Sequence, residues 1–292
     1  MKKYTSGHFL RLVYTHIVIL FFLILVPVLI GAQESDTHPY TVRSTMIGVG
    51  QSRILDTYLS PIEYKGPDIR IIRENMRLTQ WMDGRISAQN WLQANISYAD
   101  NLAKTGTMLY GLVNWSYALH YQFLVSPALK ILVGPATDLN IGFLYNSRNS
   151  NNPAQAKAYF NLMASAMAIY KISIKDFPLT LRYQVNAPFM GIMFSPEYGE
   201  SYYEIFSLKH GGRNVLFTSL HNQPSLKQLF TVDIPIRKFT LRTGYQCDLL
   251  QANVNNLKSH TFTHSFLIGF VKTFYMKKSN NKVHLSPYST PF

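Results

Sequence analysis

Apolar and polar residues alternate along most of the chain after residue 42, in stretches that turn residues separate. In the stretch 86–99, Leu92 and Ile96 fall on one face, and Gln93 and Asn95 fall on the other. The same alternation runs through 109–123 and 160–174. Successive side chains of a strand point to opposite faces, and about ten residues of a tilted strand cross a membrane. The pattern therefore predicts antiparallel strands with one apolar and one polar face.

Turn residues divide these stretches at intervals that alternate between short and long connections. The expected short connections are Asp83-Gly84, 125–128, 175–178, 210–213 and Arg237-Lys238. The expected long connections are 60–68, 100–106, 146–156, 188–200 and 250–260, while 222–225 is a brief exception. Outer-membrane barrels join their strands by tight periplasmic turns and longer external loops. We therefore predict an all-β fold, a transmembrane antiparallel β-barrel of about twelve strands.

One hairpin permits a residue-level prediction. If Arg237-Lys238 is a two-residue turn, the register outward from it is fixed. That register places Asp233 opposite Arg242 on the polar face. It also places Lys227 opposite Asp248, so two pairs of opposite charge follow from one assumed turn.

The two ends of the chain differ from the alternating region. Residues 1–32 are typical of a signal peptide, with a basic start, a short apolar run and small residues near Ala32 for cleavage. We expect a periplasmic segment over 33–42, a barrel over 43–274 and a tail over 275–292. These features predict an outer-membrane location in a diderm (Gram-negative) bacterium. The last strand, ending at Phe274, has the aromatic terminus that resembles the signal recognised by the barrel-assembly machinery.

Composition supports a membrane barrel. Charged residues make up 15% of the chain and aromatic residues 14%, including 19 Tyr and 18 Phe. Barrels place aromatic side chains at both membrane interfaces, whereas a soluble surface with so many rings invites association. The net charge is +13, and three of these charges come from the leader. The basic residues are scattered, which favours anionic lipid and lipopolysaccharide as partners and not nucleic acid.

Several short segments resemble a family of uncharacterised outer-membrane barrels, a domain of unknown function. They are 55–61 (LDTYLSP), 148–154 (RNSNNPA), 198–203 (YGESYY), 220–222 (LHN) and 263–266 (THSF). The resemblance implies a barrel and supplies no activity.

Most of these segments lie at the expected external rim, where loops on a rigid scaffold carry function. We hypothesise an external ligand site formed by Arg148, Asn149, Asn151, Asn152, Tyr198, Glu200, His221 and Asn222. The alternative is that Asn and Pro only build turns there.

Inside the barrel we expect a polar network, formed by Lys227, Asp233, Arg242, Gln246 and Asp248. Barrels of eight strands are filled by side chains, and those of sixteen or more are open. A narrow channel and a plugged lumen both remain compatible with the sequence.

A second resemblance is to outer-membrane phospholipase A, a twelve-stranded barrel with a catalytic His-x-Ser followed by Asn. The segment 145–151 is similar, but no His precedes Ser147 or Ser150. The adjacent His264 and Ser265 point to opposite faces, and His120 would need a distant Ser.

We therefore expect a non-enzymatic outer-membrane protein that binds or passes a small polar ligand at its external mouth. A phospholipase-like lipid hydrolase, a purely structural or adhesive barrel and a soluble periplasmic β-protein are the alternatives. Cys247 is the single cysteine, so there is no internal disulfide. No metal spacing, phosphate loop or dinucleotide fingerprint occurs, so no catalytic residue, metal or cofactor is predicted.

Overall fold

The computed structural model describes residues 41–82, 84–149, 152–175, 177–207, 213–236 and 239–274. The expected signal peptide, the tail, the turn Arg237-Lys238 and the candidate site residue Asn151 lie outside the described residues. Among the described residues, no helix is both long enough and apolar enough to cross a membrane.

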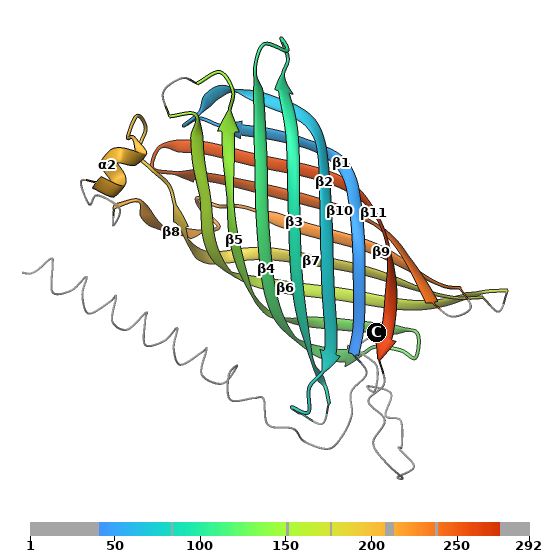
Figure 1. Ribbon diagram of the computed structural model, residues 1–292. Helices are drawn as coiled ribbons and strands as arrows, with labels where there is room; N and C mark the ends of the chain where they lie inside the picture. The colour runs from blue at the N-terminus through green and yellow to red at the C-terminus, as the bar shows by residue number, and fades with distance from the viewer. Residues whose placement is uncertain are drawn as a thin grey trace, which may run out of the picture. The chain divides into compact units, whose positions relative to one another are not determined.

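The described chain forms one antiparallel sheet (Figure 1). Its elements are β1 (Thr41–Asp56), β2 (Ser60–Leu78), β3 (Ile86–Asn101), β4 (Thr107–Leu124), β5 (Leu129–Asn146), β6 (Ala154–Ile174), β7 (Phe177–Phe194), α2 (Tyr202–Ser207), β8 (Val215–Ser219), β9 (Leu226–Ile236), β10 (Phe239–Val254) and β11 (Leu257–Phe274). Ten strands pair with their neighbours, and β1 pairs with β11, so the sheet closes on itself. The short β8 adds to one end of β7.

The expected count of about twelve strands is therefore wrong. Two of the expected strands do not form full strands of the barrel wall. The expected connections imply a strand over 201–209, but Tyr202–Ser207 is the helix α2. Ser201 and Glu204 form a capping box, in which the Ser201 amide donates to the Glu204 carboxylate at 2.7 Å and the Glu204 amide to the Ser201 hydroxyl at 3.3 Å. The second expected strand is β8, which shares the β7 edge with β9.

Two of the expected long connections, 60–68 and 250–260, are also wrong, because strands occupy most of their length. β1 and β2 are joined by residues 57–59, and β10 and β11 by Asn255-Asn256. Both asparagines have positive φ, 54° and 59°, as a tight two-residue hairpin turn requires. The expected sorting of connections by length therefore fails at these two hairpins.

The outer face of the barrel carries a continuous belt of apolar residues. Cross-strand partners form a row around the whole wall: Ile131, Ala168, Tyr183, Phe230, Tyr245, Phe266, Val49, Ile69, Ile96, Gly111 and Phe143. Gly111 faces the Phe143 ring, whose Cε1 would lie 2.7 Å from a Cβ at that position. The ring thus covers the glycine, as aromatic residues do in other sheets.

The predicted register of the β9–β10 hairpin is confirmed. Asp233 lies opposite Arg242, and Lys227 lies opposite Asp248. Phe230 on the same hairpin is 41% exposed and points outward, while Arg242 is buried inside the barrel.

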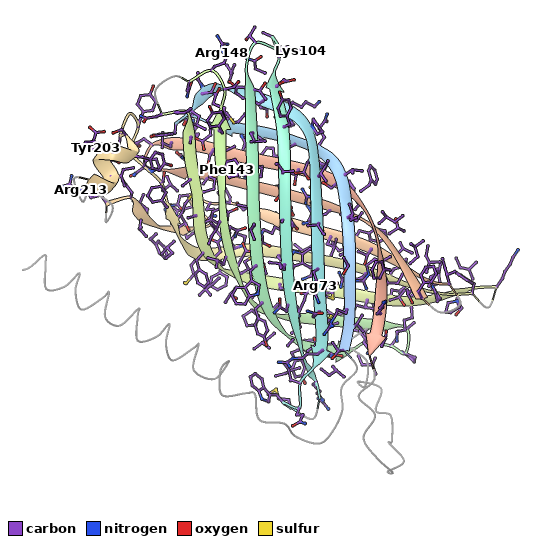
Figure 2. The ribbon with its side chains drawn as sticks, viewed as in Figure 1. Arg73, Lys104, Phe143, Arg148, Tyr203 and Arg213 are labelled. Atoms are coloured by element: carbon purple, nitrogen blue, oxygen red, sulfur yellow. The ribbon has the colours of Figure 1, made fainter. Side chains whose placement is uncertain are left out.

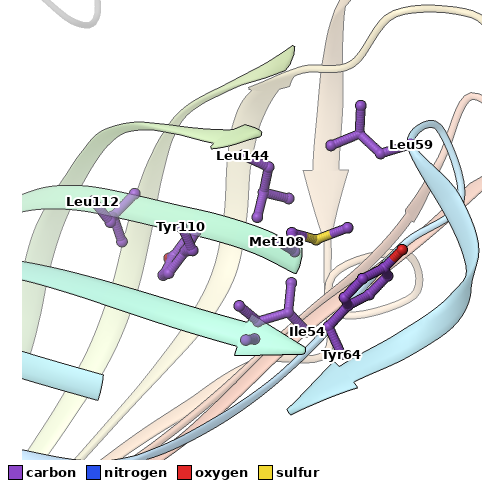
Figure 3. Close-up of a cluster of buried hydrophobic side chains, with 8 residues drawn as sticks. Ile54, Leu59, Tyr64, Met108, Tyr110, Leu112 and Leu144 are labelled. Atoms are coloured by element: carbon purple, nitrogen blue, oxygen red, sulfur yellow. The ribbon is translucent and has the colours of Figure 1, made fainter. Parts of the chain in front are cut away.

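The interior is layered along the barrel axis. At the end where α2 lies, here called the α2 end, an apolar cluster fills the lumen (Figure 3). Its buried members are Ile54, Leu59, Tyr64, Ala99, Met108, Tyr110, Leu112 and Leu144. Near the opposite end, a second apolar cluster consists of Met76, Leu132, Met167 and Ile169. Charged and amide side chains lie between these two layers.

Candidate functional site at the α2 end

The polar middle of the lumen is built around Glu74 of β2. Its carboxylate accepts hydrogen bonds from Arg182 and Arg242, both at 2.7 Å. Arg242 also makes a two-fold contact with the Asp233 carboxylate, at 2.6 and 2.7 Å. Two cations and two carboxylates are therefore neutralised together in the interior, which is the condition for burying them.

A second group surrounds Arg70 of β2. Its guanidinium donates to Asp68 at 2.7 Å, to Asp248 at 2.8 Å and to the Thr263 hydroxyl at 2.6 Å. Gly48 leaves room for this side chain, because a Cβ there would lie 2.7 Å from Cγ of Arg70. The contacts join strands from both ends of the sequence.

The third group shows that register partners and ion-pair partners differ. Lys227 lies opposite Asp248 in the sheet, but its ammonium reaches Asp138 of β5, at 2.8 and 3.0 Å. Asp248 pairs with Arg70 instead, and also accepts from Gln246 at 3.0 Å. The sequence-based expectation of a Lys227–Asp248 ion pair is therefore wrong, because the long Lys227 side chain reaches Asp138 and the long Arg70 side chain reaches Asp248.

These side chains leave little open space. The cavity in the middle of the lumen, lined by Gln89, Asn114, Gln184, Lys227 and others, has a volume of about 30 Å³. A cavity needs roughly 10–15 Å³ for one water molecule. With apolar layers above and below it, the polar middle is a plug and not a passage.

The α2 end is crossed by two segments. The first is the β1–β2 turn, residues 57–59. It is held in place by Asn149, whose side-chain amide donates to the Leu59 carbonyl at 2.7 Å. The Tyr58 hydroxyl donates to the Glu200 carbonyl at 2.6 Å. Glu200 follows β7, and β11, β10 and β9 separate β7 from β1 in the wall. Residues 195–207, the described chain directly after β7, therefore reach across the mouth of the barrel.

The crossing segment is fixed to the barrel at further points. The Ala156 amide donates to the Tyr202 hydroxyl at 2.5 Å, and the Asn255 amide donates to the Ser195 carbonyl at 2.8 Å. The rings of Tyr58 and Tyr202 meet edge to face at 6.5 Å. Burial, followed by the neighbouring Tyr202 and Glu200, raises the pKa of Tyr58 to about 12. Tyr58 is therefore a neutral hydrogen-bond donor at pH 7.

At the same end of the barrel lies the mouth cavity, a space of about 30 Å³. Its polar lining includes Lys157, Tyr159, Gln223, Ser225 and His260. The Lys157 ammonium forms an ion pair with the buried Asp56 carboxylate. The cavity thus offers one paired ammonium together with hydroxyl and amide groups, a set that suits a small polar ligand.

The structure places the expected rim residues in two groups. Arg148 and Asn149 lie at the α2 end, where Arg148 donates to the Thr105 hydroxyl at 3.0 Å (Figure 2). Glu200 lies in the crossing segment, and the side chain of Tyr198 is 77% exposed. Asn152 has a positive φ of 54°, as a turn residue does.

The other group is formed by His221 and Asn222, between β8 and β9. The Asn222 side chain accepts from the Ser219 amide at 2.8 Å and donates to the Phe217 carbonyl at 3.1 Å. Asn222 therefore has a structural role in the wall. His221 is exposed, and its Nδ1 lies 2.5 Å from the Ser219 hydroxyl.

Sequence reasoning missed several residues of the interior and the mouth. These are Asp56, Tyr58, Glu74, Lys157 and Tyr202. Asp56 and Tyr58 were visible within the segment 55–61, but no pattern in the sequence points to their partners. The capping box at Ser201 was a readable signal for α2.

Two serines lie within hydrogen-bond reach of a histidine. Inside the lumen, His120 Nε2 lies 2.8 Å from the Ser165 hydroxyl, but both residues are buried. The Nδ1 atom of His120 has no hydrogen-bond partner in the described part of the chain. The Ser219–His221 contact is exposed. Of the two, only the second is accessible from outside the barrel.

These features define a class: a closed ten-stranded antiparallel β-barrel with an apolar outer belt, a plugged polar interior and a covered mouth. The chain belongs to the family described as "Protein of unknown function (DUF3316)", whose model matches residues 17–281. This match confirms the resemblance inferred from the sequence. No curated protein matches the chain.

Solved structures with a similar architecture include three outer-membrane or surface proteins. The transport unit of the autotransporter AIDA-I from Escherichia coli has 8% identity and a TM-score of 0.41, covering 81% of this chain and 91% of that one. The outer membrane protease OmpT from Escherichia coli has 8% identity and a TM-score of 0.41, covering 84% and 100%. Neisserial surface protein A has 10% identity and a TM-score of 0.37, covering 82% and 100%. At these TM-scores no activity passes to this chain.

Proposed function

We propose that this chain is an integral outer-membrane protein that binds a small polar ligand at its external mouth. The observation that carries the proposal is the mouth cavity, which lies at the α2 end and which Lys157 lines. The outer belt supports the membrane location, because it presents apolar side chains around the whole wall. The α2 end is then the external end, with both ends of the barrel segment on the periplasmic side.

The plugged lumen favours binding at the mouth over passage through the barrel. A solute moving along the axis would have to displace the buried Leu59 and Tyr64, and then part the Glu74–Arg242 ion pair. Breaking a buried ion pair costs about 3–5 kcal/mol. We therefore expect the reconstituted protein to give no single-channel conductance steps in planar bilayers.

Ligand binding is tested by thermal unfolding of the detergent-solubilised barrel, with inorganic phosphate and glucose as separate probes. Binding at about a hundred times the Kd stabilises a protein by about 2.7 kcal/mol. We expect at least one probe to raise the unfolding temperature, and the double variant Asp56→Asn/Lys157→Met to abolish the rise. Both charges are removed together so that neither is left buried alone. Lys258→Met, at an exposed position near the mouth, is the control and should keep the rise.

The proposal is refuted if neither probe shifts the unfolding temperature, or if the double variant responds like the wild type. Conductance steps that require passage through the lumen would refute the plugged barrel. A mature chain that stays folded and dispersed in water without detergent would contradict the membrane location.

A lipid hydrolase is the second candidate, and the exposed Ser219–His221 contact favours it. In such a reaction the Ser219 oxygen would attack an ester carbonyl and pass its proton to the His221 imidazole, which would give it to the departing alcohol as the ester C–O bond breaks. Water, deprotonated by His221, would then hydrolyse the acyl-serine, releasing the fatty acid and restoring the Ser219 hydroxyl. The described residues offer no carboxylate hydrogen-bonded to this His221 ring. A fluorophosphonate probe should label the wild type but not Ser219→Ala if this candidate is right. Ser165→Ala is the matched control, and equal labelling of all three proteins would exclude Ser219 as a nucleophile.

A further inference from the structure

The barrel wall has a seam at its external end, between β8 and β10. β7 pairs with β9 over Thr180–Asn186 and with β8 over Met190–Phe194, so β8 and β9 share one edge of β7. β10 pairs with β9 only as far as Leu249. Among the described residues, the remaining part of β10, 250–254, therefore has no strand partner on that side.

The short connection 222–225 closes this seam in place of a strand. The Asn222 side chain satisfies the Ser219 amide and the Phe217 carbonyl of β8, and the main-chain carbonyl of Asn222 accepts from the Asn253 amide of β10 at 2.7 Å. The Ser225 hydroxyl accepts from the Gln251 amide at 3.0 Å and donates to the Gln251 carbonyl at 3.1 Å. Asn222 is thus the residue that joins β8 to β10.

The mouth cavity lies directly behind the seam. Gln223, Ser225 and Ala252 line both the seam and this cavity. Thr218 of β8 points inward and is fully buried, and its hydroxyl has no hydrogen-bond partner in the part of the chain that the structure describes. The inner side of the seam therefore presents polar groups that a bound molecule can satisfy.

On its outer side, the seam is bordered by apolar side chains of β8 and by polar side chains of β10. On β8, Val215 is 46% exposed and Phe217 is 60% exposed. On β10, the exposed side chains are those of Gln251 and Asn253. A border of this kind suits the boundary between lipid tails and headgroups, where an amphiphile places its chain against rings and its head against amides.

We propose that the seam between β8 and β10 is a lateral port, through which a membrane amphiphile with a polar head and an alkyl chain reaches the mouth cavity. This inference deepens the proposed function, because it rests on the cavity as a binding site and specifies the route and the class of ligand. The head enters between Asn222 and β10 toward Lys157, and the chain stays against Phe217. Opening requires the loss of four hydrogen bonds between residues 222–225 and β10, with no strand unfolding. They are the main-chain bond from Asn253 to Asn222, the two between Ser225 and Gln251, and the one from the Gln251 side chain to the Pro224 carbonyl.

The test compares two thiol reagents on one introduced cysteine. Ala252→Cys places a thiol at the inner side of the seam, in a Cys247→Ala background and in protein reconstituted into phospholipid vesicles. One reagent is a maleimide on an alkyl chain dissolved in the bilayer, and the other is a sulfonated maleimide that stays in water. We expect the lipid-borne reagent to label the thiol several-fold faster than the aqueous one. Asn222→Ala removes the two side-chain hydrogen bonds that fix the turn carrying the Asn222 carbonyl. This substitution should raise the lipid-borne rate by at least about ten-fold, the factor for a loss of about 1.4 kcal/mol, and leave the aqueous rate unchanged.

Two controls make the outcome decisive. His221→Ala changes the neighbouring exposed residue, which does not bridge the seam, and should leave both rates unchanged. Ala118→Cys places a thiol in the plugged lumen and should react with neither reagent. The lateral port is overturned if the aqueous reagent labels the seam thiol as fast as the lipid-borne one. It is also overturned if Asn222→Ala raises both rates equally, or if the lipid-borne reagent fails to label that variant. These rates do not depend on phosphate or glucose binding, so failure of the port and failure of the polar site are separable.

Discussion

Replacing Glu74 by glutamine tests whether the lumen charges hold the barrel together. The Glu74 carboxylate accepts from Arg182 and Arg242, and also from the Ser44 hydroxyl at 3.1 Å and the Gln89 amide at 2.6 Å. The substitution Glu74→Gln keeps the volume of the side chain and removes its charge. Arg242 would retain Asp233, but Arg182 would lose the carboxylate to which it is bridged.

The expected cost follows from burial, since Glu74 and both arginines are almost completely inaccessible to solvent. Removing one partner from a buried ion pair costs about 3–5 kcal/mol, because the other charge stays buried. For a domain of roughly this size, each kcal/mol lowers the melting temperature by about 2–4 °C. We therefore expect Glu74→Gln to lower the unfolding temperature by on the order of 10 °C.

The assay follows the gel mobility of the folded barrel in detergent after heating to a series of temperatures. Glu63→Gln is the matched control, because Glu63 pairs with Arg53 on the exposed outer wall and the same chemical change is made there. Exposed pairs contribute little, so the control should unfold near the wild-type temperature. The double variant Glu74→Gln/Arg182→Met should recover part of the loss, since it also removes the Arg182 charge. Equal effects of the two single variants would refute the reasoning.

Three further predictions concern packing and the mouth. Gly48→Ala should destabilise the barrel by about 1–3 kcal/mol, since the new Cβ would lie 2.5 Å from Leu267 Cδ2; urea titration of the folded fraction measures this. Gly111→Ala should cost less, because the Phe143 ring it meets lies on the outer face and can rotate; equal losses for both glycine variants would contradict this. Tyr58→Phe should remove an ionisation with a midpoint near pH 12 from the ultraviolet titration. Because the pKa is raised from the ordinary 10, the contribution of Tyr58 to stability is complete below pH 10 and is lost as the pH rises through 12, so the variant should flatten the alkaline decline.

The sequence predicted the strands best where one face is polar and the other apolar. The hairpin turn at 237–238 fixed the register of Asp233 and Arg242 because the side-chain period in a strand is two, so a shift of one residue would invert both faces. Alternation also separated the outward Phe230 from the inward Gln246. Local pattern is sufficient for such decisions.

The sequence could not predict contacts made across the lumen. Lys227 has Asp248 opposite it in the sheet, yet it binds Asp138 of a strand that lies elsewhere in the wall. That choice depends on barrel diameter and strand tilt, which no local pattern records. The strand count failed for a different reason. The expected connections left 201–209 as a strand, but the capping signal of Ser201 and Glu204 decided the local structure.

The ion pairs between β2 and β10 have a consequence for how the barrel is assembled. Arg70 meets Asp248, and Glu74 meets Arg242, although 178 and 168 residues separate the partners in the sequence. Until β1 and β11 pair and bring β2 near β10, Arg70 has only Asp68 of its own strand and Arg242 only Asp233 of its own hairpin, so Glu74 and Asp248 lack these arginines. An unfinished sheet would thus resist entering lipid, and neutralisation would accompany the final pairing. The same salt bridges that plug the finished barrel make its completion an all-or-none event.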